Sequence, residues 1–145
     1  MRRSAQEIPR DKGGPVKIGY IDTSVLIAMA FDDAGGSFIG RFVASFERLY
    51  SSNLLEAEFF SAAARENCLK DAAAFIKPVR FVYPDTNLTA FHQQVLQAGH
   101  IEGSALHHLS CAMYLFPRPE DVFFLSLHPP QAALASQLGF QTDFM

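Results

Sequence analysis

The stretch Ile18-Gly19-Tyr20-Ile21-Asp22-Thr23-Ser24 decides the fold class of this chain. Its mostly apolar first part predicts a short buried strand, and a carboxylate follows where the next helix begins. In an open α/β sheet the carboxyl ends of parallel strands share one edge, and binding sites are built there. Asp22 is therefore a candidate site residue, although aspartate is also a common helix cap. An acid in such a place is costly to desolvate without a positive partner, which points to a metal ion.

The remainder of the chain alternates between strand and helix patterns. Further strands are expected over 79–83 and 122–127, in addition to the first one over 17–21. Helical spacing of apolar residues predicts helices between and after these strands, over 25–31, from 37 to about 49, 53–70, 71–77, 87–98, 104–115 and 129–138. Thr23 and Thr86 are expected to cap the helices that follow them. Strands separated by helices predict an α/β three-layer sandwich, with a mostly parallel central sheet flanked by helices.

Length and composition predict one domain with a short arm. The 145 residues suit a single domain, and 49% hydrophobic against 19% charged residues is enough to build a core. Residues 1–16 are polar and contain Gly13-Gly14-Pro15, so we expect a flexible N-terminal arm and a domain over 17–145. The net charge of -3 argues against a DNA-coating protein, but not against an enzyme that touches a few phosphates.

Two further features bear on the compartment. Cys68 and Cys111 are too few for a disulfide scaffold and are typical of reduced thiols in a cytoplasmic protein. No apolar run approaches the roughly 20 residues of a membrane span, so no membrane partner is expected.

Four segments together resemble the PIN-domain nucleases, specifically the small bacterial toxins of the VapC type. The segments are 20–26 (YIDTSVL), 51–59 (SSNLLEAEF), 103–110 (GSALHHLS) and 124–128 (FLSLH), the last followed by 131–140. Their order and spacing carry the resemblance, which covers about residues 17–141.

The resemblance implies a function and a set of site residues. Asp22 and Glu58 match two acidic positions of the family, and Ser24 and Ser126 match helper hydroxyls. The implied reaction is hydrolysis of RNA by an endoribonuclease that uses Mg or Mn. The magnesium or manganese ion would be held by Asp22 and Glu58, activate a water and offset charge on the scissile phosphate. Implied partners are RNA, a cognate antitoxin protein and a second copy of the chain in a homodimer.

Two of the four acidic positions that the family uses are replaced here. Ala105 stands where the third acid is expected, and His128 stands where a fourth is often found. One missing charge at about 4 Å is worth roughly 4 kcal/mol at an effective dielectric of about 20, so metal binding should be weakened. Glu102, one helical turn before Ala105, and the imidazole of His128 could compensate as metal ligands. The site would then prefer manganese, or a later transition metal, over magnesium.

These replacements keep a second class of function open. The alternative is a catalytically degenerate PIN-like module that binds RNA or a protein partner. Taken alone, Glu58 is also consistent with an ordinary solvated helix residue and His128 with an ordinary loop residue. His108 lies on an apolar helix, where a structural histidine with satisfied hydrogen bonds is the simpler interpretation.

Overall fold

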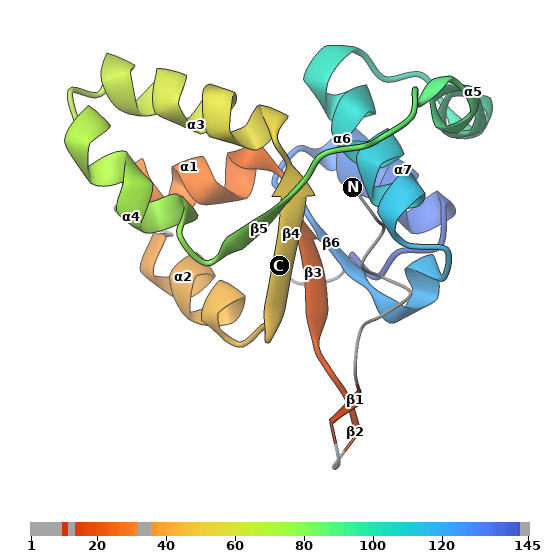
Figure 1. Cartoon of the computed structure of the whole chain (residues 1–145), viewed down its shortest axis with the longest axis horizontal. Coiled ribbons are helices and arrows are strands. Elements are labelled where there is room, and N and C mark those ends of the chain that lie inside the picture. The colour runs from red at the N-terminus through yellow and green to blue at the C-terminus, as the bar shows by residue number, and fades with distance from the viewer. Residues whose placement is uncertain (1–9, 12–13, 32–35, 143–145) are drawn as a thin grey trace.

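A parallel sheet of four strands forms the centre of the molecule, which we describe from a computed structural model over residues 10–11, 14–31 and 36–142. The strands are β3 (Ile18–Ile21), β4 (Arg48–Ser52), β5 (Val79–Val82) and β6 (Phe123–Leu125). They lie in the order β5-β4-β3-β6, and each neighbouring pair is parallel. Their carboxyl ends therefore meet at one edge (Figure 1). Asp22 follows directly after Ile21, the last residue of β3.

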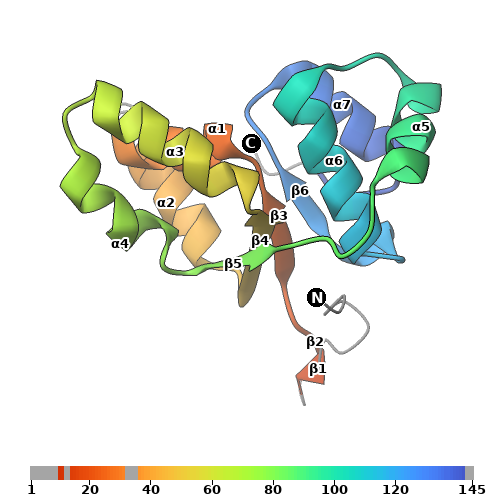
Figure 2. The ribbon, with the colours of Figure 1, turned by 45° about the horizontal axis from the view of Figure 1, so that its top comes forward.

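Helices cover both faces of this sheet, as Figure 2 shows. One layer contains α1 (Thr23–Phe31), α2 (Gly36–Ala44), α3 (Leu54–Arg65), η2 (Leu69–Asp71) and α4 (Ala72–Ile76). The other contains α5 (Thr89–Ala98), α6 (Gly103–Leu115), η3 (Pro119–Asp121) and α7 (Pro129–Gln137). The predicted three-layer α/β sandwich is thus confirmed. Among the helices of the described residues, none has the length and apolar character needed to cross a membrane.

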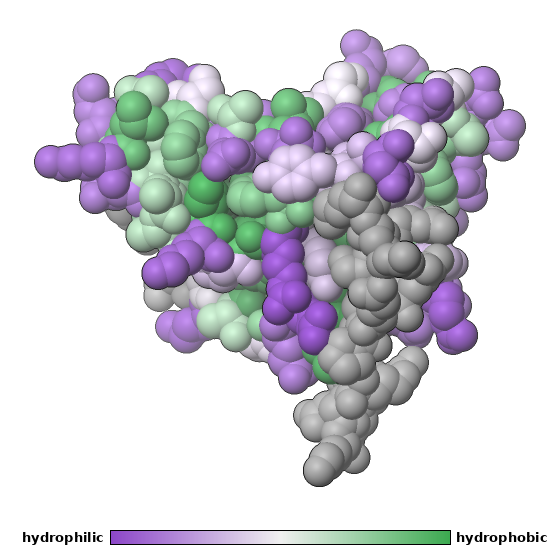
Figure 3. Space-filling view, in the orientation of Figure 1, coloured by the Kyte–Doolittle hydropathy of each residue, from purple (hydrophilic) through white to green (hydrophobic). Residues whose placement is uncertain are grey.

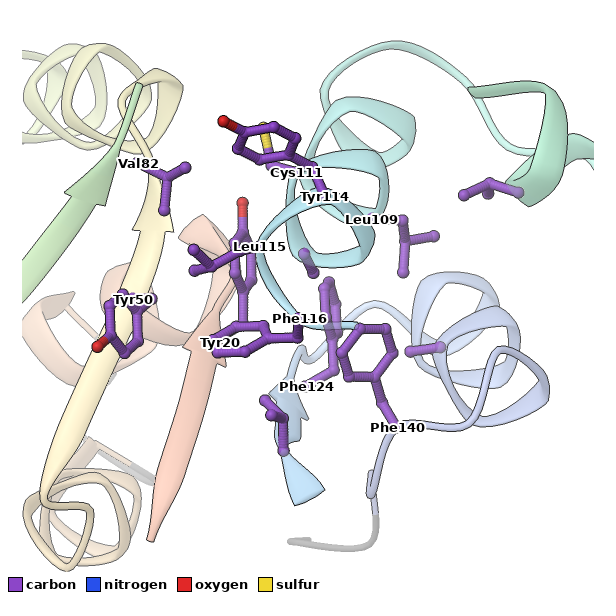
Figure 4. Packing of buried hydrophobic residues seen from close by; sticks show 14 of the residues in the cluster. Tyr20, Tyr50, Val82, Leu109, Cys111, Tyr114, Leu115, Phe116, Phe124 and Phe140 are labelled. Atoms are coloured by element: carbon purple, nitrogen blue, oxygen red, sulfur yellow. The ribbon is translucent and has the colours of Figure 1, made fainter. Parts of the chain in front are cut away.

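Each face of the sheet has its own hydrophobic core, because successive side chains of a strand point to opposite faces. Tyr20 belongs to the core beneath α5, α6 and α7, whereas Ile21 belongs to the core beneath α1 to α4. The ring of Tyr20 stacks on that of Phe124, with centroids 5.3 Å apart and planes inclined by 8° (Figure 4). Asp22, two residues after Tyr20, returns to the same face and meets side chains from α6 and α7.

The strand β4 corrects the prediction that helical structure runs to Leu49. The helix α2 ends at Ala44, and residues 48–52 instead pair with β3 on one side and β5 on the other. Because four of the five residues of β4 are buried, no alternation of polar and apolar residues marks it as a strand. Leu49 also continues the apolar spacing of α2 by chance, which hides the boundary.

Smaller corrections concern the ends of elements. The helix α3 stops at Arg65 rather than at Lys70, and a separate turn, η2, follows it. Thr86 does not cap a helix, because α5 begins only at Thr89. In the predicted arm, β1 (Arg10–Asp11) pairs antiparallel with β2 (Gly14–Pro15), and residues 1–9 and 12–13 lie outside the described part.

Candidate functional site

Asp22 is the first acid of the site and has two distinct contacts. Its carboxylate is almost buried, with 8% of the residue exposed. Oδ2 accepts a hydrogen bond from the Ser24 amide at 3.0 Å, which makes Asp22 the cap of α1. Oδ1 accepts from Nε2 of Gln131 at 3.3 Å. Asp22 is thus both a helix cap and a residue that faces α7, and the expectation that Thr23 caps α1 is wrong.

Glu58 is the second acid and projects from α3. Its Oε1 accepts hydrogen bonds from the Thr23 hydroxyl at 2.5 Å and from Nε2 of His108 at 3.1 Å. Burial alone would raise the pKa of Glu58, but hydrogen bonds from His108, Thr23 and Ser104 outweigh it and lower that pKa to about 2. Glu58 is therefore ionised at neutral pH, which is the state that a metal ligand requires.

His108 brings the two acids together. It is completely buried on α6, and its Nε2 lies 3.1 Å from Oε1 of Glu58 and 3.9 Å from Oδ1 of Asp22. Asp22 comes from the end of β3 and Glu58 from α3, so the two carboxylates reach one nitrogen from different segments. This point lies at the carboxyl edge of the sheet, where the space-filling view shows a shallow notch between the two helical layers (Figure 3).

Tyr20 determines which nitrogen of His108 carries the proton. The Ser52 amide donates to the Tyr20 hydroxyl oxygen at 3.0 Å, and that hydroxyl lies 2.9 Å from Nδ1 of His108. Burial raises the pKa of Tyr20 well above its usual value, so the phenol keeps its proton and donates a hydrogen bond to Nδ1. Nε2 of His108 then bears hydrogen and donates to Glu58. In this tautomer Nε2 is a donor to Glu58 and is not free to bind a metal.

Gln131 is a buried residue that the sequence alone did not single out. It lies in the first turn of α7 and is not exposed to solvent. Its Nε2 donates to Asp22 and, at 3.2 Å, to the carbonyl oxygen of Ala105. Its Oε1 accepts from the Ser126 hydroxyl at 2.6 Å, and Ser126 in turn accepts from the His128 amide at 3.0 Å. Gln131 thus joins three segments beside the first acid.

The two serines predicted as helper hydroxyls hold the framework of the site. Ser24 Oγ accepts a hydrogen bond from the Leu127 amide at 3.0 Å, which ties α1 to the loop after β6. Ser126 is linked to Asp22 through Gln131. In this structure the Ser24 hydroxyl bonds a backbone amide and the Ser126 hydroxyl bonds a side-chain amide, so in the described part of the chain neither bonds an acid directly.

The two predicted compensating ligands lie elsewhere. Glu102 pairs with His100 at 3.1 Å, and the two side chains are 83% and 78% exposed. His128 is exposed just before α7, and within the described ranges its ring forms no hydrogen bond or ion pair. The structure therefore does not bring Glu102 or His128 to Asp22 and Glu58.

The donor set suits one hydrated ion and does not suit two. Within residues 10–11, 14–31 and 36–142, no three His, Cys, Asp or Glu side chains are placed so that they could hold a metal ion. Two carboxylates can still hold one magnesium or manganese ion, because magnesium keeps several of its waters as ligands. A pair of adjacent ions needs more negative charge than Asp22 and Glu58 supply.

Sheet order, helical layers and the placement of the acids define a class: an α/β protein with a PIN-like fold and an acidic site at the carboxyl edge of its sheet. A chain in the 2.2 Å resolution structure of VapBC-1 from nontypeable Haemophilus influenzae has a similar fold, with a TM-score of 0.61. The likeness covers 86% of this chain and 97% of that chain, at 14% sequence identity. No protein-family model and no curated protein matches the chain. The PIN-like fold expected from the four segments is confirmed.

Proposed function

We propose that this protein is a metal-dependent endoribonuclease of the PIN type with a weakened, single-ion site. One observation carries the proposal: Asp22 and Glu58, from separate elements, converge on the same buried nitrogen at the carboxyl edge of the sheet. Two acids without a shared role would not be expected to lie together at a buried point, because each is costly to desolvate.

The residues around the acids have definable parts in this function. Asp22 and Glu58 would hold a magnesium or manganese ion. When bound, the ion would activate a water and offset the charge of the scissile phosphodiester. The Ser24 amide orients Asp22, and the Thr23 hydroxyl and His108 orient Glu58. These fixed donors keep both carboxylates in one geometry, which limits the reorganisation needed for catalysis.

The degenerate binding module remains a second candidate because of one observation. At Ala105 the site has a methyl group where an acid would add charge, and the amide of Gln131 bonds the adjacent carbonyl and Asp22. Such a site could keep the shape that recognises RNA or a protein without enough charge for catalysis.

One experiment separates the two candidates. The full chain is incubated with end-labelled RNA and MnCl2, with and without chelator, beside the variants Asp22→Asn and Asp71→Asn. We expect chelator-sensitive cutting that Asp22→Asn abolishes and that Asp71→Asn, an exposed control outside the site, leaves intact. Retention of RNA without cutting would favour the binding module. Cutting that survives Asp22→Asn would refute the proposed site.

We also propose a small antitoxin-like protein as a partner that covers the acidic notch. The support is the resemblance to VapC-type toxins together with the likeness to a chain in the VapBC-1 structure. A partner that covers the notch would hide Asp22 and Glu58 from RNA, so its binding and RNA cutting should exclude each other.

A further inference from the structure

We propose that Gln131 sets the cation affinity of the carboxylate pair, because its amide donates to Oδ1 of Asp22, an oxygen that a cation would otherwise bind. The inference rests on the proposed metal-binding role of Asp22 and Glu58. It makes this buried glutamine a determinant of cation affinity, a role that the sequence alone did not assign to it.

The orientation of the Gln131 amide follows from its neighbours. Ser126 Oγ accepts a hydrogen bond from the His128 amide, so its own proton is available for Oε1 of Gln131. Oε1 is therefore the acceptor, and the NH2 group must face the other way. There it meets two groups that only accept, the Asp22 carboxylate and the Ala105 carbonyl. Both of its N–H groups are used, and exchanging its O and N would place acceptors against acceptors.

This orientation opposes a cation. The positive end of the amide dipole points at Oδ1 of Asp22, from the side on which α6 carries Ala105. A cation on that oxygen would have to displace the N–H group, and because Gln131 is completely buried the displaced group would lose its partner without gaining water. On Glu58, Oε1 is also faced by a donor, Nε2 of His108, and His108 is held from behind by Tyr20.

A second role for Gln131 is also physically reasonable, and it predicts the opposite change in metal affinity when the amide is removed. A hydrogen bond to a metal-binding carboxylate can orient it and so strengthen binding. If Gln131 acts in that way, removing its amide weakens metal binding. If it acts as a competitor, removing its amide strengthens metal binding.

The experiment is a calorimetric titration of the full chain with MnCl2. Gln131→Met removes the N–H donors and keeps the length of the side chain, and we expect affinity to rise by about threefold or more. Gln131→Glu replaces the amide with a carboxylate of the same shape, and we expect affinity to rise by about tenfold or more. Gln137→Glu makes the same charge change at an exposed position of α7 and should match the unmodified chain. The double variant Asp22→Asn/Gln131→Glu should lose most of the gain.

Thermal denaturation shows whether each Gln131 variant still folds and gives a second measure of metal binding. Gln131→Glu places a carboxylate against Asp22, so without metal its melting temperature should fall, and MnCl2 should raise it more than it raises that of the unmodified chain. Unchanged or weaker Mn binding in both Gln131 variants, with no extra thermal shift, would overturn the inference. Since neither readout needs RNA, failure to cut RNA would refute the proposed function and leave this result standing.

Discussion

Tyr20 and Tyr50 are neighbours on adjacent parallel strands, and both are buried, with 0% and 2% of the residue exposed. The hydroxyl of Tyr20 links the Ser52 amide to His108. The hydroxyl of Tyr50 is buried without a hydrogen-bond partner among the described residues. The same chemical group therefore stabilises the fold at one position and costs free energy at the other.

This contrast gives a matched pair of variants. Tyr20→Phe leaves the Ser52 amide and Nδ1 of His108 without their partner, and we expect it to lower the free energy of unfolding by about 1–3 kcal/mol. Tyr50→Phe removes a hydroxyl that has no hydrogen-bond partner among the described residues. We expect the free energy of unfolding to change by no more than about 0.5 kcal/mol or to rise slightly. Urea denaturation of both variants measures the difference. Equal losses would contradict the hydrogen-bond relay through Tyr20.

Glu58 makes the free energy of unfolding depend on pH in the acidic range. Burial opposes ionisation of Glu58, but its hydrogen bonds lower its pKa from 4.5 to about 2 in the folded protein. Because the folded pKa lies below the unfolded value, this stabilisation is complete above about pH 4.5 and is lost as the pH falls toward 2.

A neutral variant tests this pH dependence. Glu58→Gln cannot titrate, so between pH 4.5 and 2 its free energy of unfolding should fall less steeply than that of the unmodified chain. Urea denaturation across this range, with Glu56→Gln as an exposed control on the same helix, measures the slope. Parallel curves for Glu58→Gln and the unmodified chain would show that the bonds from Thr23 and His108 do not hold the ionised form.

At the level of elements, the sequence predicts what depends on local pattern. The strands β3, β5 and β6 and the helices α6 and α7 were found because caps, prolines and apolar spacing mark them. The strand β4 was missed because burial on both faces removes the alternation that identifies a strand. Recognition of β4 needs its neighbours β3 and β5, which are distant in the sequence.

For the site, too, the sequence predicts the residues that a local pattern marks and misses those that depend on packing. Asp22 and Glu58 were predicted because each lies in a segment with a recognisable pattern. His108 was expected only as a structural residue, and Gln131 was not predicted, because each acquires its role through packing of α6 and α7 against the strand ends. A glutamine 109 residues after its partner carries no signal in spacing.

At the level of the whole molecule, the helical layer formed by α1 to α4 leaves an apolar side chain in solvent. Phe46 and Phe59 from the phenylalanine-rich segments are buried in its core, whereas Phe38 on α2 is 52% exposed. Such a side chain is available for contact with a second copy of the chain. We therefore place the predicted homodimer contact on α2.

Oligomeric state tests this placement. We expect the full chain to be dimeric at micromolar concentration in light scattering, and Phe38→Glu to shift it toward the monomer. Leu96→Glu changes a residue of similar exposure, 43%, in the opposite layer and should leave the dimer intact. A monomeric unmodified chain, or dissociation by Leu96→Glu alone, would rule out the contact on α2.

The position of α7 in the sequence has a consequence for synthesis. Asp22 and Glu58 leave the ribosome well before Gln131. Until that glutamine emerges, the first carboxylate has the Ser24 amide close at hand but not the amide that later covers its other oxygen. We therefore expect Asp22 to be more open to cations before α7 has packed than in the folded protein.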